Sequence, residues 1–165
     1  MQVKQKWENG GMKMLQIKQD NERAKFAFEK VNKIKKMYEN EEKKENENSS
    51  GNSIKNDKEG KDGDKKASKK NKYLIACKNA PSQMKVNGFG MTMAYLFSKE
   101  DSKPLYDDIV EWLNMKFYEK TGETVKGENF LKKIVSCNSS KYMQMSKETM
   151  SLLIWMKRFA EGMLK

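Results

Sequence analysis

The chain has 165 residues, of which 34 are Lys or Arg and 23 are Asp or Glu, so its formal net charge is +11. This length has room for one domain. The positive charge favours polyanionic partners: nucleic acid first, then an anionic membrane or an acidic protein surface. A soluble protein with a lysine-rich surface explains the same charge. The chain has no histidine and only Cys77 and Cys137, so it cannot supply an ordinary zinc site. We expect neither a metal nor a cofactor.

Hydropathy and cysteine content predict a cytoplasmic protein. No apolar run approaches the roughly 18–20 residues of a membrane span. Residues 1–7 lack the apolar core of a signal peptide. Two cysteines without a CxxC neighbour are typical of reduced, partly buried thiols.

The positive charge gathers at the two ends of the chain. Residues 1–39 carry ten cations and five acids, and residues 126–165 carry eight cations and three acids, so each end has a net charge of +5. Between them, residues 40–70 carry nine cations and eight acids, and residues 71–125 carry seven of each. We therefore expect any anion-binding face to be built from the first and last helices.

A first helix is predicted over residues 20–38. Its apolar positions recur at spacings of three and four, as one buried stripe requires; they are Ala24, Ala27, Phe28, Val31, Ile34 and Tyr38. Residues 1–19 form a variable arm or an extension of this helix. Residues 20–165 form a single helical domain that contains a flexible charged insertion at 40–70, because Ile54 is the one large apolar residue there.

Two more helices are predicted on either side of a glycine pair. The earlier one covers residues 72–86, where Pro81 should kink or divide it. The later one begins at Phe89 or Gly90 and ends at Ser98. Its apolar residues are Met91, Ala94, Tyr95 and Phe97.

The element between these helices is Asn87-Gly88-Phe89-Gly90. A glycine in a helix costs about 0.5–1 kcal/mol relative to alanine, so a pair of them indicates close backbone approach or a helix junction. A phosphate-cradling loop is the less favoured interpretation, because the Gly-x-x-x-x-Gly-Lys-Ser/Thr spacing and a preceding strand are both missing.

A fourth helix is predicted to start with Ser102 as its cap and Pro104 in its first turn, and to end at Thr121-Gly122. Its apolar stripe consists of Tyr106, Ile109, Val110, Leu113 and Phe117. Its solvent-exposed face consists of Asp107, Asp108 and Glu111. The adjacent pair Asp107 and Asp108 diverges on a helix and makes a poor catalytic dyad.

Two further helices complete the predicted fold. A short one has Phe130, Leu131, Ile134 and Val135 as its apolar residues and ends near residues 138–140. The last one is capped by Ser146, with Glu148 in its first turn. Its inward residues are Leu152, Leu153, Met156, Ala160, Met163 and Leu164, and Trp155 and Phe159 widen the stripe. The predicted fold is all-α, a compact bundle of five or six helices with a long disordered loop after the first helix.

Several cations are candidates for phosphate contacts. A basic groove is predicted from Lys25, Lys33, Lys36, Lys132, Lys133 and Lys141. Lys157 and Arg158 diverge by about 100° on their helix, and Arg158, opposite Leu153 and Ala160, is the better candidate of the two. A solvated lysine face explains any one of these lysines equally well. A surface cation near the helix C-terminus explains Arg158 equally well.

Three motifs resemble the small-subunit family of the type III-B CRISPR effector, the Cmr complex. One is the run from Asn87 through Gly88, Phe89 and Gly90 to Ser98-Lys99. Another is the C-terminal run from Ser146 to Gly162, which contains Trp155-x-Lys157-Arg158-Phe159-Ala160. The third is Arg23-Ala24-x-x-Ala27 with Val31, and Tyr142 before the last helix also fits.

The resemblance implies a non-catalytic protein that stacks beside the backbone subunits and helps line the groove for guide RNA and target RNA. The implied partners are the backbone and large subunits and both RNAs, with self-association along the complex left open. Alternatives are the small subunit of the related type III-A effector, or a stand-alone helical nucleic-acid-binding protein. A small enzyme is a third hypothesis, but the sequence shows no convergent set of catalytic groups.

Overall fold

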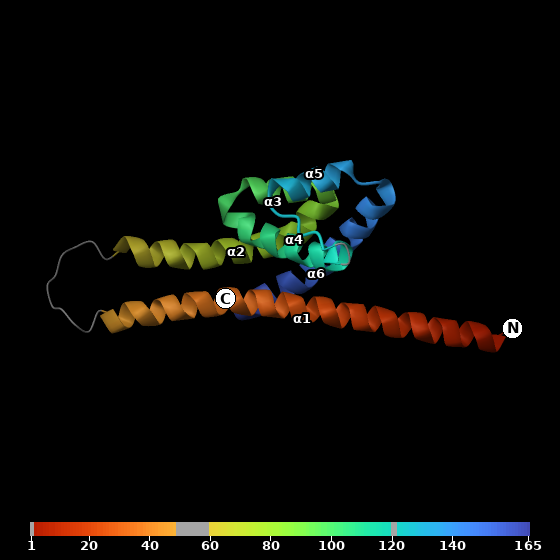
Figure 1. Cartoon of the computed structure of the whole chain (residues 1–165). Coiled ribbons are helices and arrows are strands. Elements are labelled where there is room, and N and C mark those ends of the chain that lie inside the picture. The colour runs from red at the N-terminus through yellow and green to blue at the C-terminus, as the bar shows by residue number, and fades with distance from the viewer. Residues whose placement is uncertain (1, 49–59, 120–121) are drawn as a thin grey trace.

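Six α-helices and one 3-10 turn make up the part of the chain that the computed structural model describes. This part covers residues 2–48, 60–119 and 122–165, with side chains described at residues 14–37, 39–40, 70–119 and 122–165. The elements in chain order are α1 (Gln2–Asn48), α2 (Gly60–Asn87), α3 (Phe89–Ser98), η1 (Glu100–Ser102), α4 (Lys103–Phe117), α5 (Glu128–Ser136) and α6 (Ser139–Met163) (Figure 1). The predicted all-α class is confirmed, since no strand is assigned among these residues.

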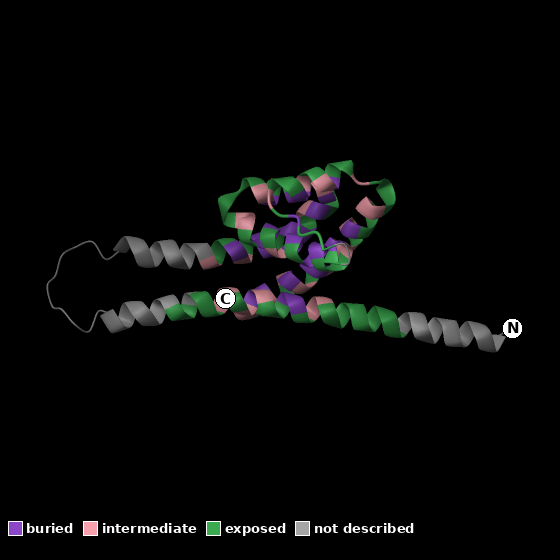
Figure 2. Ribbon diagram, viewed as in Figure 1, coloured by how far each residue is buried: buried purple, intermediate pink, exposed green. Residues whose placement is uncertain are grey.

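Helices α1 and α2 both pack against α6, and α3 packs against α2, α4 and α5. In Figure 1, α5 and α3 lie on the side of the bundle away from α1, and the N-terminal part of α1 extends past the bundle. Buried residues gather where the helices meet (Figure 2). The largest fully buried side chains include Trp112, Tyr73, Tyr106, Phe89 and Phe130. Removing such aromatic surface from water supplies the main driving force for this packing.

Helix α1 is longer in both directions than the predicted helix over residues 20–38. The apolar stripe marks only the section that packs on the bundle, whereas Lys-, Glu- and Gln-rich flanks without proline let a helix continue beyond it. Helical structure therefore covers both ends of the predicted charged insertion, 40–48 and 60–70, and residues 49–59 lie outside the described residues. Tyr38 of the predicted stripe also has no described side chain.

The stripe on α1 needs one correction. Phe28 is exposed, and Phe26 is buried in its place. Helix α1 lies between two helices: the Phe26 ring meets Trp112 of α4 with centroids 4.9 Å apart, and the Phe28 ring meets Phe159 of α6 at 5.6 Å. The three- and four-residue spacing of apolar positions predicts one buried side of a helix. It cannot show that two neighbouring helices pack on different sides of that helix.

An ion pair fixes α1 on α6. Arg23 donates two hydrogen bonds to Glu148, from Nε to Oε1 at 2.7 Å and from Nη2 to Oε2 at 2.8 Å. The indole Nε1 of Trp112 in α4 donates to the same Oε1 at 3.1 Å. Both charged side chains are largely buried, and the bond to Glu148 raises the pKa of Arg23. Three helices thus meet at one carboxylate.

The boundaries of α2 and α6 differ from the prediction. Helix α2 runs as one helix through the buried Pro81, which does not divide it. Helix α6 begins seven residues before Ser146, because the side chain of Asn138 caps it by accepting a hydrogen bond from Lys141 N at 2.9 Å. Glu148 therefore lies inside α6, where it can reach Arg23, and not in its first turn.

Three further expectations need correction. Helix α4 ends at Phe117, and its predicted cap Ser102 makes no side-chain capping bond. In α3 the buried residues are Phe89, Thr92, Met93 and Leu96, which are three and four residues apart and so share the side that faces the core, while Met91, Ala94 and Tyr95 are exposed. In α5, Val135 is 83% exposed, because it lies on the side of the helix away from the core, where Phe130 and Ile134 are buried and Leu131 packs against them in part.

Asp108 does not lie on a solvent-exposed face as predicted. Its Oδ2 accepts a hydrogen bond from the Tyr73 hydroxyl at 2.8 Å, and Lys30 Nζ lies 3.7 Å from Oδ1. Burial raises the pKa of Asp108 to about 6 from an ordinary 3.8, although the Tyr73 hydroxyl and Lys30 partly oppose the shift. The neighbouring Asp107 instead points to Lys103, so the two carboxylates do not form a dyad.

Candidate nucleic-acid interface

The outward side of α1 carries a row of exposed cations. Lys18, Lys25 and Lys36 are seven and eleven residues apart, close to two and three full helical turns, so they share one side of the helix. The buried residues Ala27 and Val31 occupy the opposite side. None of the three lysines pairs with a carboxylate among the described residues, although the exposed Glu29 shares this side of the helix.

Helix α6 carries a matching row on its own outward side. Lys147 and Arg158 are eleven residues apart and both exposed, whereas Leu153 and Ala160 are fully buried. Neither cation pairs with a described carboxylate. Lys157 is half-buried, so Arg158 is the more accessible of the two adjacent candidates. Because α1 and α6 pack on each other, the two rows lie on neighbouring helices.

Aromatic side chains occupy the seam between these helices. The rings of Trp155 and Phe159 stack with an interplanar angle of 21° and centroids 5.7 Å apart, and the edge of Phe28 meets Phe159. Trp155 Nε1 donates to Asp20 Oδ1 at 3.0 Å, which ties α6 to α1 at this point. Phe28 remains partly open to solvent. Cations interleaved with accessible aromatic rings are typical of surfaces that bind single-stranded nucleic acid.

The predicted groove of six lysines does not form one surface. Lys132 and Lys133 lie on α5, on the side of the bundle away from α1 (Figure 1). Lys132 pairs with Glu128 at 3.0 Å, and Lys133 pairs with Glu123 at 2.9 Å, which raises the pKa of Lys133. Lys141, at the start of α6, lies 3.9 Å from the ring centroid of Tyr118. These three lysines already have partners within the chain.

Lys33 stands apart from both rows. It is exposed, but it lies on the flank of α1 that faces α4, close enough for its charge to lower the pKa of Asp108. Of the predicted lysines, Lys25 and Lys36 therefore belong to the outward row and Lys33 to its edge. Sequence reasoning missed Lys18 and Lys147, which the spacing of seven and eleven residues could have revealed.

The Asn87-Gly88-Phe89-Gly90 element joins α2 to α3. Gly88 caps α3 with φ +78°, a conformation that favours glycine, and its carbonyl accepts hydrogen bonds from both the amide and the hydroxyl of Thr92. The Gly90 amide donates to the Tyr142 hydroxyl of α6 at 3.0 Å. With that amide engaged in a helix contact, the geometry supports the packing interpretation over a phosphate loop.

The described residues contain no group of three His, Cys, Asp or Glu side chains placed to hold a metal ion. In the same part of the chain, every helix is too short or too polar to cross a membrane.

Comparison with known proteins identifies the family. Residues 56–163 match the family model of a CRISPR-associated protein, Cas_Cmr5. The chain belongs to the Cmr5 family. Its fold is also that of a crystal structure of a CRISPR-associated Cmr5 family protein from Thermus thermophilus, with a TM-score of 0.57 at 16% sequence identity over 89% of this chain and 98% of that one.

Membership of the Cmr5 family confirms the resemblance inferred from the three motifs and makes the chain a small subunit of the type III-B Cmr complex. The family implies interaction with other components of that complex. The family match begins at residue 56, so α1 and its motif Arg23-Ala24-x-x-Ala27 lie outside it. Within this chain, Arg23 of that motif contacts Glu148.

Proposed function

We propose that this chain acts without catalysis, stacks along the backbone subunits of the complex and binds guide RNA and target RNA. The observation that carries the RNA-binding part is the pair of cation rows on the outward sides of α1 and α6. They leave Lys25, Lys36, Lys147 and Arg158 without carboxylate partners among the described residues. Lys18 extends the α1 row.

The rows suit contacts with the RNA backbone. Lysine and arginine bind phosphates without reading sequence, which fits a subunit of a complex whose guide RNA selects the target. The aromatic seam of Phe28, Trp155 and Phe159 adds surface on which an unpaired base can rest. We assign no RNA contact to Lys132 and Lys133, because Glu128 and Glu123 already neutralise them.

A non-catalytic role agrees with the state of the obvious catalytic groups. Asp107 is paired with Lys103, and Asp108 with Tyr73 and Lys30. The thiol of Cys77 is fully buried, and burial raises its pKa far above neutral, so it is not a nucleophile at neutral pH. Both cysteines are free, as we expect for a cytoplasmic protein.

Copurification from the native host tests the proposal. A tagged chain should recover the backbone and large subunits of the Cmr complex together with a guide RNA. Recovery with the components of a type III-A effector would favour that alternative. A chain that elutes alone and binds one duplex DNA site tightly at physiological salt would be a stand-alone regulator.

Charge reversal at single residues tests the RNA face within the purified complex. Arg158→Glu should reduce ultraviolet crosslinking of this subunit to RNA while leaving copurification intact. Lys133→Glu is the matched control on α5 and should leave crosslinking unchanged. Equal effects of the two variants would mean that Arg158 is an ordinary surface cation.

A further inference from the structure

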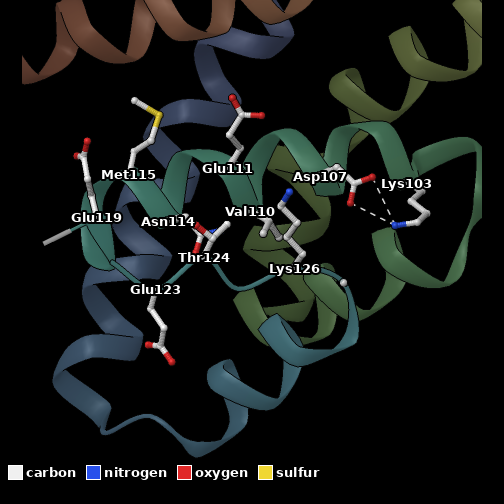
Figure 3. Close-up of a pocket in the computed structure, with 11 residues that line it drawn as sticks. Lys103, Asp107, Val110, Glu111, Asn114, Met115, Glu119, Glu123, Thr124 and Lys126 are labelled. Carbon is white, nitrogen blue, oxygen red and sulfur yellow. Dashed lines mark hydrogen bonds and ion pairs between the residues drawn. The ribbon is translucent and has the colours of Figure 1, made fainter. Parts of the chain in front are cut away.

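The hollow beside α4 is lined by charged side chains that already pair within the chain. It has a volume of about 750 Å³ and lies between α4 and the segment that leads to α5 (Figure 3). Three of its carboxylates form ion pairs; these pairs are Asp107 with Lys103, Glu111 with Lys30 and Glu123 with Lys133. Most of its charged groups are therefore not free to recognise a ligand.

A smaller pocket between α2 and α3 has polar groups that are free. Its volume is about 190 Å³. From α2 it is lined by Ile75, Asn79 and Gln83, which are four residues apart and so share one side of the helix. From the end of α3 it is lined by Tyr95 and Lys99, which are also four residues apart. Two helix sides of mixed polarity thus border one pocket.

The apolar part of the pocket presents an accessible aromatic ring. Tyr95 is 44% exposed, and the buried residues Ala76 and Leu96 line the same pocket. A half-exposed aromatic ring beside buried apolar residues is a surface on which a nucleobase can stack, whatever its sequence. The volume is below the roughly 300–1,000 Å³ of pockets for drug-sized ligands, so the pocket has room for one small planar group.

The polar part of the pocket has unused hydrogen-bonding groups. The side-chain amides of Asn79 and Gln83 make no hydrogen bond with a described residue. Each amide offers one acceptor and two donor hydrogens, which is the combination that pairs with the edge of a nucleobase.

One cation of the pocket is also free. Lys99 is exposed and forms no ion pair with a described residue, whereas Lys72 pairs with Asp101 at 3.0 Å and neutralises that carboxylate. The free charge left at the pocket is therefore positive, and a lysine of this kind binds a phosphate group.

We propose that the pocket between α2 and α3 binds one unpaired nucleotide. The base stacks on Tyr95, its edge meets the amides of Asn79 and Gln83, and its phosphate lies at Lys99. A nucleotide within a single strand and a free nucleotide both have this chemistry. The site goes beyond the proposed function and does not rest on it, because the cation rows lie on α1 and α6 and α3 lies on the side of the bundle away from α1.

Nuclear magnetic resonance of the full-length ¹⁵N-labelled chain tests the site directly, since the side-chain NH₂ signals of Asn79 and Gln83 report contact with a base. The probes are the four ribonucleoside monophosphates and pentamers of A, C and U. Both signals should shift and saturate with at least one of these probes. A pentamer that binds at least tenfold more tightly than its mononucleotide would identify the source as a strand, and equal affinities would identify a free nucleotide.

The same titration in a chain without the cation rows separates this site from the RNA face. The rows are removed in the variant Lys25→Gln/Lys36→Gln/Lys147→Gln/Arg158→Gln. The signals of Asn79 and Gln83 should still shift in this variant. Loss of the shifts would place the binding on α1 and α6 and overturn the proposal, while the proposed function would stand.

Substitutions in the pocket complete the test. Tyr95→Ala should weaken binding by about fivefold to a hundredfold, whereas Tyr95→Phe keeps the ring and should bind as the wild type does. Met91→Ala is the control at an exposed position of α3 outside the pocket. Lys99→Gln should weaken binding and make it less sensitive to salt, and Lys85→Gln is its control on α2.

Two results would contradict the proposal. One is the absence of any shift of the Asn79 and Gln83 signals with every probe at millimolar concentrations. The other is unchanged nucleotide binding by Tyr95→Ala. If that variant also failed to copurify with the complex, the pocket would be a contact with a protein subunit instead.

Discussion

The backbone amide of Gly90 donates a hydrogen bond of 3.0 Å to the hydroxyl of Tyr142, so the start of α3 lies directly against this side chain of α6. A Cβ atom at position 90 would lie 3.3 Å from that hydroxyl oxygen. The Tyr142 ring also meets the edge of Phe89, with centroids 5.4 Å apart. Gly90 is therefore required by the close approach of a particular side chain.

Replacing Gly90 with alanine should destabilise the protein by about 1–2 kcal/mol, because the added methyl group pushes Tyr142 away from its hydrogen bond. In a Tyr142→Phe background the oxygen is gone, and the same replacement should be neutral or slightly stabilising, since alanine favours a helix. Urea unfolding of the four proteins measures this coupling. Equal effects in both backgrounds would show that Tyr142 is not the reason for the glycine.

Two other glycines should respond in opposite ways. Gly88→Ala places a side chain at φ +78° and should destabilise by about 1 kcal/mol or more, although no atom lies within 4 Å of the new Cβ. Gly162 lies inside α6 with equally open space and no positive φ, so Gly162→Ala should stabilise by up to about 1 kcal/mol. Thermal unfolding measures the sign of the change in stability for both variants. A loss of stability in Gly162→Ala would contradict the explanation from helix propensity.

Removing Arg23 should affect stability far more than removing an exposed cation. Arg23→Ala leaves the largely buried Glu148 with only the Trp112 indole, and we expect a loss of about 2 kcal/mol or more. Lys35→Ala breaks the ion pair with Glu39. The side chains of Lys35 and Glu39 are 41% and 50% exposed, so this change should alter stability by less than about 0.5 kcal/mol. Urea titration compares the two, and similar losses would mean that the α1–α6 junction does not depend on this pair.

Asp108 should make the protein less stable as pH rises. Its folded pKa of about 6 exceeds its ordinary value of 3.8, so between these values the folded state holds more protons than the unfolded state. The stability that this group contributes is complete below about pH 4 and is lost as pH rises through 6.

Asp108→Asn keeps an acceptor for the Tyr73 hydroxyl and cannot ionise, so the variant should lack this part of the pH dependence. The difference in unfolding free energy between variant and wild type should move in favour of the variant from pH 4 to pH 7. The expected change is on the order of 1–3 kcal/mol, since one pKa unit corresponds to about 1.4 kcal/mol. A difference that stays constant with pH would show that Asp108 is already ionised at pH 4.

Much of the fold follows from local patterns. The helical class, the order of the helices and the packing role of Gly88 and Gly90 could be predicted, because periodicity and backbone conformation are local properties. The exposure of Arg158 opposite Leu153 and Ala160 also follows from helical spacing. The start of α6 was misplaced because the capping side chain is Asn138, in a Ser-rich stretch that resembles the end of a helix.

Contacts between distant residues could not be predicted in this way. Glu148 meets Arg23 across 125 positions, and nothing near either residue shows that the two side chains share a buried site. The predicted groove of six lysines does not form for the same reason. The sequence shows that Lys132 and Lys133 lie on one helix, but it does not show the carboxylates that pair with them. It also does not show that α5 and α1 lie on different sides of the bundle.

The salt dependence of RNA binding by the assembled complex tests the RNA face most directly. The variant Lys25→Gln/Lys36→Gln/Lys147→Gln/Arg158→Gln removes four charges from the outward rows. The control Lys78→Gln/Lys85→Gln/Lys132→Gln/Lys133→Gln removes four from α2 and α5. If each row residue contacts one phosphate, the slope of log K against log salt should flatten by about 2.8 for each copy of the subunit that contacts the RNA, at about 0.7 for each contact to a single strand. The control should keep the wild-type slope. Equal slopes for all three complexes would contradict the proposal that the cation rows on α1 and α6 bind RNA.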